Sequence, residues 1–500
     1  MSIRQVYSVC RRLVGCATHS HSLMNMVQTS FPADSLQEQL PSNTQRYENT
    51  PSVPSRAIVI PSGLLSPQSF RDKISTNLPE GWQCCQNPAE GRSYFRHSTL
   101  RIMTESNITD ERISRRVMDW SRAILPLINR STRDDYDIVL NVSESAEGGM
   151  GRCGYYLVDY DSEAIFWLRD VSTTLMGLPD VRSPTHLKHL LSEQFWVHCE
   201  YMPPPHQNFT ARAQGLLATL GTLCIDASSS TGSVSPFHQD ECEMYSRSLT
   251  QVLKTGCAIE INWCLARLQS LLTQSRIINL FGEPNARADR NVVVNGQTAP
   301  VETATFVLWS MIMFNIPSIY LTRWNAIWVD RVTYTREWKK LTRDLTEEFL
   351  YGLIASGVIV IAGVVLLGLS TSGAVRTLAA AAMILALCGG YYAASLFSTL
   401  RTLGGCAADA ANFIQMNEHV TTGLQGMALR HSVPSALIVW SGLCLLTAGF
   451  WEICMDMIRS GLPVTWVSWK DMMVPVLVVM TYLYGRGYFS LARLYNLCRR

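Results

Sequence analysis

Hydrophobic residues crowd the last third of the chain, where long uncharged runs alternate with short polar segments. One run of twenty-two residues, 349–370, reads FLYGLIASGVIVIAGVVLLGLS, and two others cover 377–400 and 433–451. A helix crosses the hydrocarbon core of a membrane with about 20 apolar residues, so each run is long enough. We therefore predict a transmembrane helix at all three places.

Two weaker runs flank this pattern. Residues 472–484 are uncharged but Arg486 follows them closely, and we include them as a fourth span. Residues 303–322 are uncharged as well, yet Asn315 and Pro317 fall in their second half, and whether they form a fifth span stays open. The expectation for residues 349–500 is thus a four-helix transmembrane region.

The segment before the first span, residues 301–348, is expected to be an amphipathic juxtamembrane segment. Trp324, Trp338 and other apolar residues alternate there with Arg and Lys. A basic helix that carries Trp directly before a span is typical of a helix lying in the membrane interface. We predict such a helix over 323–345; the alternative is a core helix with a solvated basic face.

Residues 71–300 read as a globular, mainly helical region with two small antiparallel β-sheets. Short strands are expected in 71–108, and a second β patch at 138–170 lies within the helical region 109–300. Thr109 is the expected cap of one helix. Ser183 followed by proline predicts the start of another, which Pro203, Pro204 and Pro205 should stop near residue 201.

Composition and charge give further predictions about the N-terminal segment and about the partners of the protein. Residues 1–70 are rich in Ser, Gln, Asn and Pro and predict a disordered N-terminal tail. Arg4, Arg11 and Arg12 precede any acidic residue, so a mitochondrial transit peptide is the alternative there. The whole chain carries 42 basic and 40 acidic residues, so no bulk field indicates a nucleic-acid partner.

Charges that flank the spans predict their orientation. With four spans, eleven Lys or Arg residues lie on the N-terminal side and three on the other: Arg331, Arg336, Lys339, Lys340, Arg343, Arg401, Arg430, Arg486, Arg493, Arg499 and Arg500 against Arg376, Arg459 and Lys470. Positive residues collect on the cytosolic side, which predicts an integral membrane protein with both termini cytosolic. The glycosylation sequons at Asn107, Asn129, Asn141 and Asn208 would then be chance.

Small residues recur every fourth position in the second span, at Ala382, Ala386, Gly390, Ala394 and Ser398. Such a stripe lets helices approach closely, and it predicts a compact bundle or a contact within a homo-oligomer. The interiors of the first three spans hold no Asp, Glu, Lys, Arg or His. Ion and proton pathways generally need such groups, so a transporter is the weaker interpretation.

One short stretch has a recognisable pattern. The segment Leu78–Trp82 reads LPEGW and, with Gly91, Tyr94 and Phe95 downstream, resembles the first two strands of a WW domain. The resemblance implies that Trp82 packs against Phe95, and that Tyr94, Arg96 and Ser98 face a groove for Pro-rich peptides. The family's second Trp and closing Pro would fall near Glu105 and Ile108, where neither is present.

The second β patch adds a Tyr-Tyr strand, GYYLVD at 154–159, and a Trp strand, IFWL at 165–168. A degenerate second WW-like unit and an ordinary hairpin are both open. The order of these motifs, followed by the Ser-Pro helix, IYLTRWNAIWVD at 319–330 and the apolar spans, resembles basidiomycete WW-domain-containing multi-pass membrane proteins of uncharacterised function. That resemblance covers roughly 78–490 and implies a layout without an activity.

Candidate chemical sites are weak. His186, His189 and Glu193 share one helical face with ligand-like spacing, but an apolar stripe beside them indicates a solvated side and not a metal site. Asp159 and Asp161 open an imperfect calcium-loop pattern that a turn between strands explains. No phosphate-binding loop, nucleophile elbow or metalloprotease motif occurs, so we expect no enzyme, no metal and no cofactor.

These observations together predict a membrane-anchored interaction or scaffolding protein. Its expected partners are the lipid bilayer, Pro-rich protein segments and a second copy of the chain. The alternative is a small-molecule channel or transporter formed by the C-terminal helices.

Overall fold

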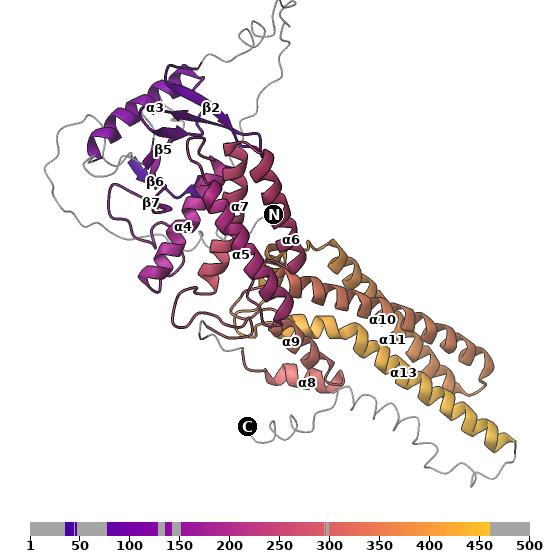
Figure 1. Ribbon diagram of the computed structural model, residues 1–500. Coiled ribbons are helices and arrows are strands. Elements are labelled where there is room, and N and C mark those ends of the chain that lie inside the picture. The colour runs from indigo at the N-terminus through magenta and orange to yellow at the C-terminus, as the bar shows by residue number, and fades with distance from the viewer. Residues whose placement is uncertain are drawn as a thin grey trace, which may run out of the picture. The chain divides into compact units, whose positions relative to one another are not determined.

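The computed structural model describes residues 36–44, 46–47, 78–128, 136–142, 152–294, 296 and 300–460. These divide into two compact units, with the boundary between Asp289 and Arg290. The N-terminal unit contains a β-sheet with helices, and the C-terminal unit is helical (Figure 1). The prediction of a mainly helical chain with apolar helices near its C-terminus is confirmed at this level.

The two predicted antiparallel sheets are one mixed sheet, so that prediction is wrong. Its strands are β1 (Leu36–Glu38), β2 (Trp82–Gln86), β3 (Ser93–His97), β4 (Ile102–Thr104), β5 (Tyr136–Val142), β6 (Cys153–Asp159) and β7 (Ala164–Phe166). They lie in the order β1-β6-β5-β4-β3-β2, with β7 also on β6. The parallel pair β4 and β5 joins the two halves, because helix α3 (Glu111–Ile124) provides the long connection that a parallel pair needs.

Part of the predicted disordered tail belongs to this sheet. Strand β1 pairs in parallel with β6, aligning Leu36 with Cys153, and it is followed by the short 3-10 helix η4 (Pro41–Asn43). The indole N–H of Trp167 also donates to the carbonyl of Gln39 at 3.1 Å. The tail prediction is therefore corrected for these residues, since a backbone ladder fixes a segment whose composition alone is polar. Residues 1–35 and 48–77 lie outside the described residues.

The two faces of the sheet are covered by different helices (Figure 1). Trp82 and Phe95 share one core cluster with Trp120 of α3. Side chains of the opposite face belong to another hydrophobic cluster, which they share with the C-terminal helices of the unit, α4 (Pro184–Tyr201), α5 (Thr210–Ser229), α6 (Gln239–Thr255) and α7 (Ala258–Ile278). Since neighbouring strand residues point to opposite faces, Tyr94 lies on this second side.

The helix boundaries follow local capping chemistry. Ser183 caps α4 by accepting from the N–H of His186, and the helix ends at Tyr201 before the three prolines, so both predictions are confirmed. The cap of α3 is Asp110 and not Thr109, because the Asp110 carboxylate accepts from the N–H of Arg112 at 2.8 Å. A 3-10 turn, η5 (Leu125–Leu127), extends α3.

The C-terminal unit contains six helices in its described part: α8 (Ala304–Ile312), α9 (Ile316–Ala326), α10 (Thr335–Leu369), α11 (Gly373–Thr402), α12 (Ala407–Asn417) and α13 (Gln425–Arg459). Among them α10, α11 and α13 are long and apolar enough to cross a membrane. They contain the first three predicted spans. The fourth, at 472–484, lies outside the described residues.

The predicted interfacial helix over 323–345 is not a single element. Helix α9 ends at Ala326, and Asp330 and Arg331 have left-handed backbone conformations before α10 begins at Thr335. The basic segment 335–348 then continues into the first predicted span without a break, as one helix. Trp338 and Leu345 are buried in the unit's own core, as the alternative of a core helix required.

The three long helices have an inside-out distribution of side chains. Several large aliphatic residues are 57% to 68% exposed: Ile354, Val358 and Ile361 on α10, Ile384 and Leu387 on α11, and Ile453 on α13. The buried positions of α11 include the small residues Ala382, Ala386 and Gly390 of the predicted stripe. Small residues between helices and large apolar ones on the outer surface are typical of helices that pack in lipid.

Candidate functional site

The structure buries two of the three residues predicted to line a peptide groove. Tyr94 is 1% exposed and Arg96 is 7% exposed, whereas Ser98 is exposed just beyond the end of β3. The Tyr94 hydroxyl donates a hydrogen bond to the carbonyl of Pro203. A proline-rich segment does meet the predicted aromatic residue, but it is the segment of this same chain that ends α4.

Two amides hold that segment in place. Asn87, in the turn after β2, donates to the carbonyls of Glu200 at 2.8 Å and Tyr201 at 3.2 Å. From the other side, Asn262 of α7 donates to the carbonyl of Pro204 at 2.8 Å. Since a buried main-chain carbonyl without a donor is costly, these side chains stabilise the chain reversal after α4.

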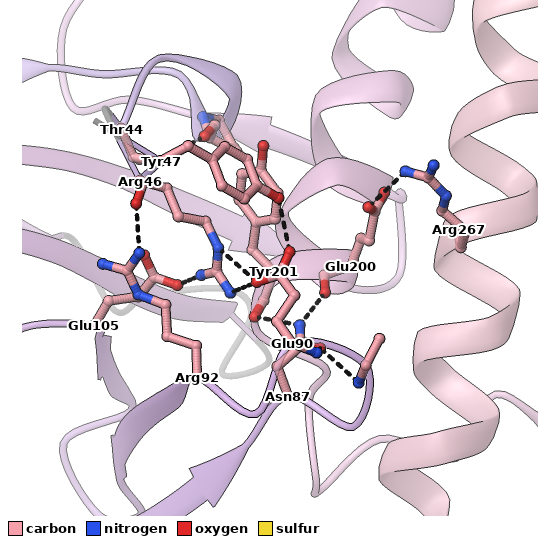
Figure 2. Close-up of polar contacts among 12 residues, drawn as sticks. Thr44, Arg46, Tyr47, Asn87, Glu90, Arg92, Glu105, Glu200, Tyr201 and Arg267 are labelled. Atoms are coloured by element: carbon pink, nitrogen blue, oxygen red, sulfur yellow. Dashed lines mark hydrogen bonds and ion pairs between the residues drawn. The ribbon is translucent and has the colours of Figure 1, made fainter. Parts of the chain in front are cut away.

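A cluster around Arg46 includes Glu105, the residue near which the second WW tryptophan would fall. Arg46, 3% exposed, forms ion pairs with Glu90 and with Glu105, and its guanidinium lies 4.7 Å from the centre of the Tyr201 ring. Figure 2 shows Arg46 between the two carboxylates and beside Tyr201. The face that the resemblance assigns to a peptide is therefore occupied by residues that come before and after the WW-like strands in the sequence.

Arg96 belongs to a second polar cluster, centred on Asp137 of β5. The Asp137 carboxylate is 1% exposed in its side chain, and it lies 3.3 Å from an Arg96 nitrogen and 3.3 Å from Nε2 of His206. It also accepts from the Tyr160 hydroxyl at 3.0 Å. Charge and hydrogen-bond partners on several sides offset the cost of burying this carboxylate.

The cluster continues to His198 of α4, which is fully buried. Its Nδ1 lies 3.1 Å from the Tyr156 hydroxyl and its Nε2 lies 3.5 Å from the Tyr160 hydroxyl. Because Tyr160 uses its own proton for Asp137, the neutral ring fits with Nδ1 accepting from Tyr156 and Nε2 donating to Tyr160. Burial lowers the pKa of His198 from 6.5 to about 3, so the ring is neutral at physiological pH.

Sequence reasoning missed the members of this cluster other than Arg96. A signal did exist: Asp137 sits in a strand whose next residues read IVL, and His198 is flanked by Phe195–Val197 and a cysteine. An ionisable residue in such apolar surroundings is buried with a partner more often than not. On this geometry, the cluster links strand β5 to helix α4 through a chain of hydrogen bonds from Asp137 through Tyr160 to His198.

The candidate metal-binding residues on α4 are mostly buried. His186 and Glu193 are buried, so the interpretation of a solvated helix side is wrong for these two. Nδ1 of His186 accepts from the N–H of Arg182, and Glu193 accepts from the Gln274 amide, so the two side chains have different hydrogen-bond partners. Within the described ranges no group of three His, Cys, Asp or Glu residues could hold a metal ion.

The calcium-like acidic pattern is a turn, as expected. Asp159 closes it by accepting from the N–H of Asp161 at 2.9 Å, between β6 and β7. The Tyr-Tyr strand β6 and the short strand β7 form a hairpin that continues the single sheet, but β7 ends at Phe166, so Trp167 lies just outside the strand.

An exposed backbone edge remains on the WW-like side. In β2, Cys85 faces Tyr94 and Gln83 faces Arg96 in the ladder with β3. The N–H of Ser98 donates to the carbonyl of Gly81, and the N–H of Asn87 donates to the carbonyl of Arg92. Hydrogen-bonded and non-hydrogen-bonded pairs alternate along an antiparallel ladder, so the N–H groups of Cys84 and Gln86 point away from β3. Strand β2 is the last strand of the described sheet on this side, and Gln83, Cys84 and Gln86 are exposed.

Comparison of the chain with protein-family models, with curated proteins and with solved structures gave no match.

Proposed function

We propose that this protein is an integral membrane protein whose N-terminal unit acts as an interaction or scaffolding module. The observation that carries the proposal is the outward-facing apolar surface of α10, α11 and α13, with small residues between the helices. In water such a surface would be a strong association liability, whereas in a bilayer it is the solvated face.

The interaction part of the proposal rests on the edge strand β2. Its outward N–H and C=O groups match an extended segment of a partner protein, which would add a strand by main-chain hydrogen bonds. The WW-like face is a poor docking surface in comparison, because Tyr94 and Arg96 are engaged with the chain itself. In this proposal the partner is an extended peptide and the contact is backbone-directed.

Membrane insertion is tested by extraction of membranes from cells that express the full chain. We expect the protein to stay in the pellet at alkaline pH and to enter the supernatant only with detergent. Recovery of folded, monodisperse chain without detergent would overturn the proposal.

Orientation is proposed to be cytosolic for the N-terminal unit. Its sequons at Asn107 and Asn208 are exposed, so they would be accessible to the glycosylation machinery if the unit were luminal. The expected result is no change in mass on glycosidase treatment, and loss of the unit under protease added outside intact organelles. Glycan on either residue would contradict this orientation.

Partner binding at β2 is tested with a photo-reactive residue in place of Gln83 in the full chain, in its own membranes. We expect a discrete cross-linked species that Cys84→Pro abolishes, since proline removes an outward N–H. Cys84→Ser is the matched control and should retain it, and the same probe at Ile225 of α5, which is exposed too, should give none. Cross-linking that is insensitive to the proline would refute the edge as the binding surface.

A further inference from the structure

Helices α8 and α9 replace the candidate fifth span with two short pieces. The nine residues of α8 and the eleven of α9 are separated by Met313–Asn315, where Phe314 and Asn315 have left-handed backbone conformations. Neither helix reaches the length of about 20 residues that a crossing needs. The run 303–322 therefore does not cross a membrane as one continuous helix.

Helix α8 nevertheless has an apolar outer surface. Leu308, Trp309, Met311 and Ile312 are between 43% and 58% exposed, and no charged residue occurs between Thr303 and Thr322. Four large apolar side chains on a nine-residue helix are far more than scattered surface residues provide. Their common surrounding must be apolar for α8 to be stable there.

The hairpin follows α13 into the depth of the proposed membrane. At the start of α8, the Thr303 hydroxyl donates to the side-chain oxygen of Gln425, the first residue of α13. At its end, the Trp440 indole N–H donates to the carbonyl of Ile312 at 3.1 Å. Trp440 lies ten residues beyond Arg430, roughly 15 Å along the helix, which is about half of a ~30 Å hydrocarbon core.

Helix α9 returns to the side from which α8 came. The rings of Phe314 and Trp440 are 5.0 Å apart at the turn, and farther along Trp324 lies 5.2 Å from His431. Charged residues are found next to this contact: Arg323 forms an ion pair at 2.7 Å with Glu348, which directly precedes the first predicted span.

The backbone carbonyls at the end of α8 are paired within the protein, as a position at membrane depth requires. The carbonyls of Trp309, Ser310 and Met311 accept from the N–H groups of Met313, Asn315 and Phe314, and that of Met313 accepts from Ile316. The carbonyl of Ile312 is the exception in this series, and it receives the Trp440 indole instead. Irregular backbone is tolerated within a bilayer only when its polar groups are paired within the protein.

We propose that α8 and α9 form a re-entrant hairpin that enters the hydrocarbon core to about its middle and leaves on the same side, with lipid chains covering the outer face of α8. The inference rests on the proposed membrane insertion, because α13 must cross the bilayer for Trp440 to lie at that depth. It keeps residues 301 and 336 on one side despite the apolar run between them, so the run adds no fifth span to the predicted topology.

Single cysteines placed in the full chain test this in sealed, oriented vesicles. The variants are Val301→Cys and Arg336→Cys at the two ends, Leu308→Cys and Ile312→Cys on α8, and Val420→Cys and Ile458→Cys as references beside the two ends of α13; all six positions are exposed in the structure. A membrane-impermeant maleimide is applied from either side, and mass spectrometry of each peptide separates the new thiol from native cysteines. Maleimide needs a hydrated thiolate, so a lipid-covered cysteine stays unmodified.

The expected pattern is labelling of Val301→Cys, Arg336→Cys and Val420→Cys from one side and of Ile458→Cys from the other. Leu308→Cys and Ile312→Cys should react at least tenfold less in intact vesicles than after detergent is added. Labelling of both α8 positions in intact vesicles would place the hairpin in water, and labelling of the two ends from opposite sides would make it a crossing; either result overturns the inference. Labelling of both α13 references from one side would instead overturn membrane insertion itself.

Discussion

The hydroxyl of Tyr94 donates a hydrogen bond to the main-chain carbonyl of Pro203, which links the WW-like strands to the proline segment of the same unit. Both residues are buried, and burial raises the pKa of the Tyr94 hydroxyl well above its usual value, so it remains a donor across the physiological range. An aromatic residue of the kind that grips foreign proline peptides is here part of the unit's own core.

Replacing this donor should destabilise the N-terminal unit. Tyr94→Phe leaves the buried Pro203 carbonyl without the hydroxyl, at a cost of about 1–2 kcal/mol. Thermal unfolding of the full chain in detergent, followed by the protease resistance of residues 78–289, should shift to lower temperature. Tyr47→Phe is the control, because Tyr47 is 61% exposed and its hydroxyl bond to Glu90 is exposed to water. Equal shifts for the two variants would contradict the structural role of Tyr94.

Packing of the three long helices should depend on Gly390. A Cβ there would lie 2.5 Å from Oγ of Ser356 on α10, so Gly390→Ala should separate the helices and cost about 1–3 kcal/mol. Gly368→Ala is the matched control on α10, where a Cβ meets nothing within 4 Å. Combining Gly390→Ala with Ser356→Ala removes the nearest atom and should recover part of the loss. The measurement is the detergent unfolding temperature, and an additive double variant would argue against this contact.

The stability of the N-terminal unit should fall in mild acid because of His198. Its pKa is 6.5 when unfolded and about 3 when folded, so the unfolded chain binds the extra proton between these values. Stability is then full above about pH 6.5 and declines below it by up to ~1.4 kcal/mol per pH unit, flattening near pH 3. His198→Asn should be less stable at pH 7 but have a shallower slope from pH 6 to 4. The measurement is the protease resistance of the N-terminal unit as a function of pH. The control His419→Asn, at an exposed histidine of the other unit, should leave this pH dependence unchanged.

Two adjacent cysteines should differ sharply in reactivity. Cys84 is exposed on β2, whereas Cys85 is 4% exposed and burial raises its pKa. We expect maleimide to modify Cys84 at least tenfold faster than Cys85 in the native chain, since the reaction needs an accessible thiolate. Peptide mass spectrometry distinguishes the two sites, and denaturant should remove most of the difference. Equal native rates would mean that β2 is not in the described register.

Elements with strong local signals were predictable. Helices α10, α11 and α13 follow from uncharged length, and α4 follows from the Ser183 cap and the prolines after Tyr201. Each of these depends on residues close together in the sequence, and the physical cause acts over a few turns of helix.

Long-range pairings were not predictable by the same reasoning. The parallel contact of β1 with β6 joins Leu36 to Cys153, and nothing in either segment specifies the other. The burial of Tyr94 illustrates the same limit, because strand alternation indicates the face of a side chain and not which helix covers that face. Asp137 and Pro203 become part of the site only through such packing.

Helix α10 is a single helix that contains both the predicted span and the segment before it, so the two parts must tilt together. Fourteen residues, 335–348, extend from the predicted span, and at 1.5 Å per residue they form an arm of roughly 21 Å. If a thinner bilayer tilted the span by about 10°, the end of this arm near Thr335 would swing by about 4 Å. Bilayer thickness would in this way be converted into sideways movement at the base of α9 and α12, whose residues pack on Trp338.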